Sequence, residues 1–193
     1  KEKIYSKLWD SCSFMDNYIE NNLAVSLNCT KTDIYQNLYI SNIDNLKDVE
    51  LGANILLDSI SKNLHICIVT DYDFDGISSA VVLTKGIKNI LKHKNTTTVV
   101  NKRIYGNGFN PRIVRKILDI NSDKKIDLII TADHGSNDDE YYIELKNKIK
   151  DLKIILTDHH TISKYPKNVD AFINPMREDS TYDKSISGCC TAF

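Results

Sequence analysis

Between residues 64 and 175, short apolar runs alternate with segments of helical periodicity, and this alternation limits the possible folds more than any other feature. The apolar runs are rich in β-branched residues, which is typical of buried strands, whereas the segments between them repeat apolar residues every three or four positions. We expect strands at 64–71, 96–104, 126–133, 152–158 and 169–175, and helices at 77–93, 111–120 and 138–150. Such alternation predicts an α/β fold with a parallel sheet of about five strands flanked by helices.

The first 63 residues follow a different pattern. Apolar side chains recur at helical spacing near the start, and a second helical stretch runs from about residue 42 to 61. We therefore predict a helical N-terminal element at 1–63, followed by the α/β domain at 64–193. A chain of 193 residues is long enough for one such domain with a small accessory element.

Acidic and imidazole side chains follow three of the predicted strands directly, in the motifs DYDFDG, TADHGS and TDHH. They are Asp71, Asp73, Asp75, Asp133, His134, Asp158, His159 and His160. Because the carboxyl ends of parallel strands meet at one edge of a sheet, we expect these side chains to lie together. Two like charges at about 4 Å repel each other by about 1 kcal/mol in water and about 4 kcal/mol at an effective dielectric constant of 20. A divalent cation such as Mn²⁺ suits this ligand set, and two ions can share a bridging carboxylate and activate water for phosphoester hydrolysis.

Each motif taken alone has a simpler interpretation. DYDFDG resembles the start of a calcium loop, but that loop needs a Glu six residues after its glycine, where this chain has Val82. Acidic runs are also common in solvated turns, His-His pairs are common on surfaces, and Asp133 is an ordinary candidate for a helix N-cap. Three acidic strand ends in one chain, the last with two histidines, favour a metal site over these interpretations.

The composition excludes several classes of protein. Lys and Arg total 25 and Asp and Glu total 26, so bulk positive charge alone cannot hold a nucleic acid. No apolar run approaches the roughly 18–20 residues of a membrane span, and the N-terminus lacks the apolar region of a secretory signal. The five cysteines have no CxxC spacing, so we expect reduced thiols in a cytoplasmic protein without a membrane partner.

The three acidic motifs resemble those of the DHH phosphoesterase superfamily. The triple-aspartate form of the first motif is most similar to the RecJ branch, the single-strand-specific 5′→3′ exonucleases. NKRIYGNGFN at 101–110 resembles the N-R-x(n)-G-Y-G-L stretch of that branch, and FINPMRE and SGCCTAF resemble its NP…R and G-A-G-V-A-F segments. The resemblance covers about residues 64–193. It implies hydrolysis of single-stranded DNA with a pair of Mn²⁺ or Mg²⁺ ions, and partners among replication or repair proteins.

The resemblance also implies roles for individual residues. The residues that match metal ligands of the family are Asp71, Asp73, Asp75, Asp133 and His159. Among these, Asp133 matches the carboxylate expected to bridge two metals, and Asp71 is a ligand or a support.

The remaining candidates serve catalysis and substrate binding. His160 would contact the scissile phosphate or assist proton transfer, and Asp158 would orient a histidine. Candidate substrate-binding residues are Arg103, Gly106, Gly108 and Ser136. The Gly-Asn-Gly sequence is also typical of a turn, and Arg103 of a solvated surface.

The chain departs from the pattern of the family in two places. His134 stands where the branch usually has a small polar residue, and we expect it to fill space rather than bind metal. The fourth-motif aspartate and the DHH-associated domain have no counterpart, so we expect the native protein to continue past Phe193 or a partner chain to supply the rest.

Two other functions stay open. One is a DHH-type hydrolase of short oligonucleotides or cyclic dinucleotides, although those branches usually carry His where this chain has Val69. The other is a non-catalytic nucleic-acid-binding or assembly module that retains the motifs.

Overall fold

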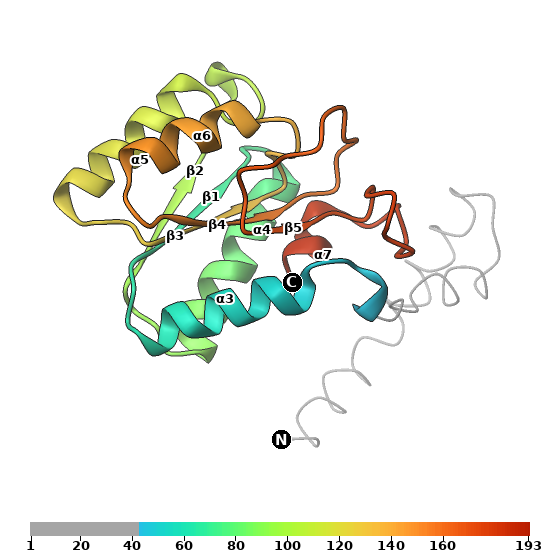
Figure 1. The fold of residues 1–193 in the computed structure, drawn as a ribbon, viewed down its shortest axis with the longest axis horizontal. Helices are drawn as coiled ribbons and strands as arrows, with labels where there is room; N and C mark the ends of the chain where they lie inside the picture. Colours follow the sequence, from blue (N-terminus) through green and yellow to red (C-terminus); the bar gives the residue numbers. More distant parts are fainter. Residues whose placement is uncertain (1–42) are drawn as a thin grey trace, which may run out of the picture. The chain divides into compact units, whose positions relative to one another are not determined.

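A computed structural model describes residues 43–193, in which a five-stranded sheet lies between two layers of helices (Figure 1). The strands are β1 (Ile66–Thr70), β2 (Thr96–Val100), β3 (Leu128–Ala132), β4 (Lys153–Thr157) and β5 (Ala171–Ile173). Every neighbouring pair is parallel, and the strand order is β2-β1-β3-β4-β5. The predicted α/β fold with a parallel sheet is therefore confirmed.

Helices cover both faces of this sheet. They are α3 (Val49–Ser61), α4 (Phe74–Lys85), α5 (Pro111–Asp123), α6 (Asp139–Lys148) and α7 (Gly188–Ala192), with short helical turns η1 (Ile43–Asn45), η2 (Gly86–Ile90) and η3 (Arg103–Tyr105). In Figure 1, α5 and α6 lie on one side of the sheet and α3 and α4 lie on the other. Among the described helices, none has the length and apolar character needed to cross a bilayer.

The two helical layers explain why the strand sequences are apolar throughout. Cys67 and Val69 of β1 pack into the cluster that contains residues of α5 and α6. Ile66 and Ile68, the alternate positions, belong to a second cluster, against which residues of α3 and α4 pack. Because successive side chains of a strand point to opposite faces and both faces are covered, every residue of β1 is buried.

Helix α3 packs on the same sheet as the later helices. Ile55 and Ile60 of α3 contact the second core cluster, and Asp48 Oδ2 accepts a hydrogen bond from Phe172 N at 3.1 Å. The helix therefore belongs to the same compact unit as the sheet. The boundary at residue 63 stays a prediction, and the helix expected near the start of the chain lies outside the described residues.

Candidate metal centre

Asp133 lies at the centre of the predicted cluster. It follows β3 directly, has a left-handed φ of 63° and is 1% exposed. His159 Nε2 lies 3.2 Å from Asp133 Oδ1 and 3.6 Å from Asp75 Oδ2. One ligand atom each from Asp133, His159 and His160 lies within 4.8 Å of the others. The ends of β3 and β4 and the first turn of α4 therefore meet at this point.

Among the described residues, the Asp133 carboxylate has no hydrogen-bond donor to stabilise its charge. Both of its oxygens are buried, and neither accepts a hydrogen bond from the described residues. Burial, together with the nearby charges of Asp75 and Asp73, raises the pKa of Asp133 from 3.8 to about 8. A buried carboxylate of this kind is costly unless a cation compensates it. The donor set therefore fits a divalent metal ion.

The hydrogen bonding of His159 prepares it to bind a metal ion. Its Nδ1 lies 3.0 Å from the carbonyl oxygen of Ile186. Because a carbonyl only accepts hydrogen bonds, Nδ1 carries a proton, and in the neutral ring Nε2 then presents a lone pair. That lone pair faces the carboxylates of Asp133 and Asp75. A second hydrogen bond that sets the tautomer in this way is the usual arrangement for a metal-ligating histidine.

His160 is held differently from its neighbour. Its Nδ1 bonds to Asp158 Oδ1 at 2.7 Å, and this hydrogen bond raises the pKa of His160 to about 9. Asp158 is buried and also accepts hydrogen bonds from the backbone N–H groups of Ser136 at 3.0 Å and His159 at 2.7 Å. Burial opposes its ionisation, but the hydrogen bonds from His160 and Ser136 hold the pKa of Asp158 well below its usual range. His160 is therefore a cation that Asp158 orients.

The three aspartates of the first motif occupy different environments. Asp71 is buried, and its Oδ1 lies 3.5 Å from the side-chain nitrogen of Asn101. Asp73 caps α4, because its Oδ1 accepts a hydrogen bond from Gly76 N at 3.0 Å. Asp75 is the one that lies beside His159. Gly76 is needed because a Cβ at this position would collide with the backbone carbonyl of Asp71.

Helix α7 packs directly on the centre, which sequence reasoning missed. Asp75 accepts hydrogen bonds from the backbone N–H groups of Gly188 and Cys189, both at 2.7 Å. Gly188 also lies so close to Asp133 that an added Cβ would overlap its carboxylate. The sequence did hold a signal for the start of this helix. Ser187 is a typical N-cap residue, and its side chain caps α7.

The predicted substrate-binding residues fall into two places. Ser136 lies buried beneath the centre, where its N–H bonds to Asp158 and its hydroxyl accepts a hydrogen bond from Asn174. The remaining three lie in the segment after β2, which reaches the first motif through Tyr72. They are Arg103, Gly106 and Gly108.

Hydrogen bonds of Asn101 and Tyr72 fix that segment. Asn101 Nδ2 donates to the carbonyl oxygens of Gly106 at 2.9 Å and Gly108 at 3.2 Å. Both glycines have positive φ, of 84° and 70°, which permits the tight path that these hydrogen bonds require. The Tyr72 hydroxyl bonds to Asn107 Oδ1 at 2.6 Å and joins the segment to the first motif.

His134 points into the core. Its ring lies 5.0 Å from that of Phe109, and burial lowers its pKa, so the imidazole is neutral. Neither ring nitrogen has a hydrogen-bond partner within residues 43–193. This packing agrees with the expectation that His134 fills space.

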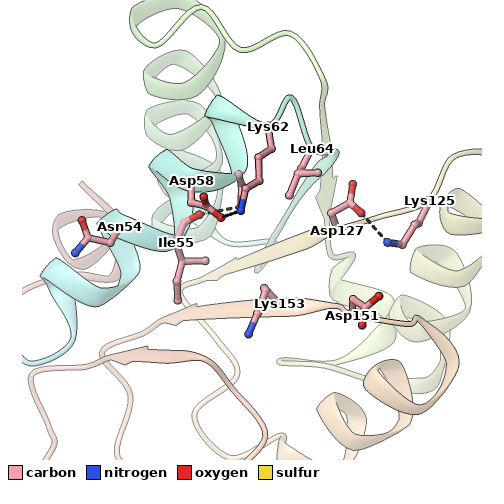
Figure 2. Close-up of a pocket in the computed structure, with 10 residues that line it drawn as sticks. Asn54, Ile55, Asp58, Lys62, Leu64, Lys125, Asp127, Asp151 and Lys153 are labelled. Carbon is pink, nitrogen blue, oxygen red and sulfur yellow. Dashed lines mark hydrogen bonds and ion pairs between the residues drawn. The ribbon is translucent and has the colours of Figure 1, made fainter.

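A shallow cavity of about 500 Å³ lies at the opposite edge of the sheet, between α3 and the starts of β3 and β4 (Figure 2). Lys62 pairs with Asp58 there at 2.7 Å, and Lys125 pairs with Asp127 at 2.9 Å. The charges of this cavity are thus largely compensated within the protein. The uncompensated carboxylates lie at the carboxyl edge instead.

Comparison with known proteins finds related sequences and structures. The family model for the DHH family, N-terminal domain, matches residues 65–193. Two curated relatives are described as single-stranded-DNA-specific exonuclease RecJ. The protein from Haemophilus influenzae is 25% identical over 153 residues, which cover 79% of this chain and 26% of that protein. The Escherichia coli protein is 27% identical over 149 residues, which cover 77% of this chain and 25% of that protein. The chain thus spans about a quarter of the length of these relatives.

Solved structures show the same fold. Exonuclease RecJ bound to manganese superimposes with a TM-score of 0.65 at 24% identity, covering 76% of this chain and 36% of that one. RecJ from Thermus thermophilus in complex with Mn²⁺ gives a TM-score of 0.60 at 23% identity, covering 77% and 20%.

Proposed function

Because the chain belongs to the DHH family, we propose that it is a metal-dependent phosphodiesterase that degrades single-stranded DNA from its 5′ end. The observation that carries the proposal is the Asp133 carboxylate, which is buried without a hydrogen-bond donor from residues 43–193 and lies 3.2 Å from Nε2 of His159. The preference for single-stranded DNA and the exonuclease mode come from the relatives described as single-stranded-DNA-specific exonucleases.

The proposed metal ligands are the acidic and imidazole groups at the carboxyl edge of the sheet. They are Asp71, Asp73, Asp75, Asp133 and His159. Asp133 would be the ligand shared by two Mn²⁺ or Mg²⁺ ions, and the lack of other partners for both of its oxygens among the described residues supports this role. When bound, such ions supply Lewis acidity for a phosphoryl oxygen and for an attacking water.

His160 and Asp158 would act on the phosphate itself. With a pKa of about 9, His160 is protonated at neutral pH, and more than half of its side chain is exposed. Because Nδ1 is held by Asp158, the Nε2–H group is left to donate to a phosphate oxygen or to the leaving oxygen. Asp158 keeps the imidazolium charged and oriented without itself taking the proton.

The segment after β2 would position the nucleotide. Arg103 is exposed on this segment and can pair with a phosphate, as an arginine guanidinium does well. Gly106 has open space beside its Cα, so a nucleotide can approach the backbone there, whereas Gly108 lies against the Asp138 carboxylate and would act by keeping the segment in its tight path. Ser136 would act by holding Asp158 in place.

The test is a Mn²⁺ titration against a single-stranded oligonucleotide labelled at its 5′ end. We expect release of labelled mononucleotide only with metal, from the unmodified chain and from the control Asp123→Asn, which alters an exposed carboxylate at the far end of α5. The variant Asp133→Asn should release none. Labelled mononucleotide released without metal, or equally from Asp133→Asn, would contradict the proposal, as would a folded chain that releases none under any condition.

A further inference from the structure

A long part of the chain after the first motif contains no acidic residue. From Gly76 to Leu118 there is neither Asp nor Glu, although the whole chain carries a formal net charge of −1. The cations in this stretch are Lys85, Lys88, Lys92, Lys94, Lys102, Arg103, Arg112, Arg115 and Lys116. Positive charge is therefore concentrated in one continuous part of the sequence.

The fold keeps these cations around one edge of the sheet. The stretch forms most of α4, then η2, β2 and the first half of α5, and β2 is the edge strand. Five of the cations follow the carboxyl end of β2, and we call them the β2 flank. They are Lys102, Arg103, Arg112, Arg115 and Lys116.

The β2 flank is exposed, and its charge is uncompensated. All five side chains are exposed, and none forms an ion pair with any residue that the structure describes. Lysines near the other edge of the sheet behave differently. Lys146 and Lys153, for example, both pair with Asp170, at 2.7 and 2.9 Å. Uncompensated cations without a nearby carboxylate favour a polyanionic partner.

The β2 flank is continuous with the metal centre. Asn101, which precedes Lys102, has its side-chain nitrogen 3.5 Å from Asp71 Oδ1. The Tyr72 hydroxyl, between the first two aspartates of the motif, bonds to Asn107 Oδ1. The first motif and the start of the β2 flank are therefore neighbours in space, although 30 positions separate Asn101 from Asp71 in the chain.

Two of the cations lie beside an aromatic ring. The guanidinium carbon of Arg112 lies 4.7 Å from the centroid of the Tyr105 ring, and Lys102 Nζ lies 6.0 Å from it. Ile104, next to Tyr105 in the chain, is 81% exposed. Cations held beside an aromatic and an apolar surface match a strand that offers phosphates and bases at short intervals.

We propose that a single-stranded polynucleotide runs from the metal centre across the β2 flank, with its phosphates against these five cations. The inference rests on the proposed function, because it takes the metal centre as the place where the strand is cleaved. It adds that the substrate is a strand that extends several nucleotides beyond the reacting phosphate, rather than a dinucleotide.

The test measures binding of an oligothymidylate by fluorescence anisotropy with a chelator present. The oligonucleotide has about 20 nucleotides, which is longer than the roughly 4–16 nucleotides that a single-strand-binding OB fold covers. The variant replaces Arg112, Arg115 and Lys116 by alanine. The matched control replaces Lys124, Lys148 and Lys150 by alanine, since these are also exposed but lie at the far ends of α5 and α6. Both variants lose the same charge, so general electrostatics change equally.

We expect the β2-flank variant to bind more weakly and its plot of log K against log salt to be shallower by about 2, since each phosphate contact on a single strand contributes about 0.7. The control should keep the slope of the unmodified chain. Equal slopes in the two variants would overturn the inference, and so would an unmodified chain that binds no strand. Thermal unfolding of each variant checks that it is folded. Arg115→Glu, a single change at an exposed position, should also make the plot of log K against log salt shallower.

Cleavage assays separate this inference from the proposed function. With Mn²⁺, we expect the β2-flank variant to lose activity on long strands but to keep it on a dinucleotide. A chain that binds through the β2 flank yet never cleaves would overturn the proposed function alone. A chain that cleaves long strands equally well with and without the β2 flank would overturn the inference alone.

Discussion

Replacing Asp133 by asparagine is expected to stabilise the metal-free protein and to remove its response to metal. Asparagine has nearly the same shape and tolerates the left-handed φ of 63° at this position. The change removes a carboxyl group whose ionised form is destabilised by burial and by the carboxylates of Asp75 and Asp73, and which lacks a hydrogen-bond donor among the described residues. The residue that we propose as the shared metal ligand is thus a source of instability when no metal is bound.

The size of the effect follows from the raised pKa of Asp133, from 3.8 to about 8. A carboxyl group whose pKa is raised by folding costs nothing below pH 3.8, and its cost grows as the pH rises toward the folded value. At pH 7 the pH exceeds the ordinary pKa by about 3 units, which corresponds to at most about 4 kcal/mol of unfolding free energy. The neutral amide avoids this cost at every pH.

The difference in unfolding free energy between Asp133→Asn and the unmodified chain is measured by urea unfolding with a chelator present, repeated from about pH 5 to about pH 8. The advantage of Asp133→Asn should increase steadily with pH. Excess Mn²⁺, at about 100 times its dissociation constant, should then stabilise the unmodified chain by about 2.7 kcal/mol and leave the variant unchanged. A variant no more stable than the unmodified chain at pH 7, or an advantage independent of pH, would refute the reasoning.

Three further changes test other contacts. Arg177→Ala should lower the unfolding free energy by roughly 2–3 kcal/mol, measured by urea unfolding, because the Arg177 side chain is only 7% exposed and bridges two acidic side chains. Gly188→Ala should abolish the rise in Tm with Mn²⁺, because its methyl group would overlap the Asp133 carboxylate. Asp158→Asn should lower the pKa of His160 from about 9 toward 6.5, as read from an NMR titration of the ring protons, because it removes the charged hydrogen-bond partner.

Gly86→Ala is the matched control for the glycine change. Its φ is −56°, a Cβ there meets nothing within 4 Å, and alanine favours helix, so stability should rise by about 0.5–1 kcal/mol with the metal response intact. A metal response that survives in Gly188→Ala would show that metal does not bind at Asp133. If Arg177→Ala unfolds at the same urea concentration as the unmodified chain, the ion pairs of Arg177 contribute nothing to the unfolding free energy. If the titration of His160 is unchanged in Asp158→Asn, His160 is not paired with Asp158.

Local patterns predicted the elements of the fold well, and their ends less well. The strand expected at 64–71 is β1, Ile66–Thr70, because an uninterrupted β-branched run marks a strand buried on both faces. The strand expected at 96–104 ends at Val100, where the side chain of Asn101 turns the chain. The helix expected from residue 77 begins at Phe74, because Asp73 caps it, and it changes to a π-helical turn at Gly86. Hydrophobic periodicity reports which side is buried, whereas capping and side-chain hydrogen bonds decide where an element stops.

The sequence by itself determined which residues reach the carboxyl edge of the sheet, because parallel strands with right-handed connections bring their ends to one side whatever the order of the strands. Only the tertiary structure decided which of these residues meet. Asp75 holds Gly188 from 113 positions away, and Arg177 holds Asp48 from 129 positions away. The strand order and the packing of α7 and α3 against the sheet create these contacts. Local periodicity does not encode such contacts, because they depend on the path of the whole chain. They also depend on which buried polar groups find a hydrogen-bond partner in the folded protein.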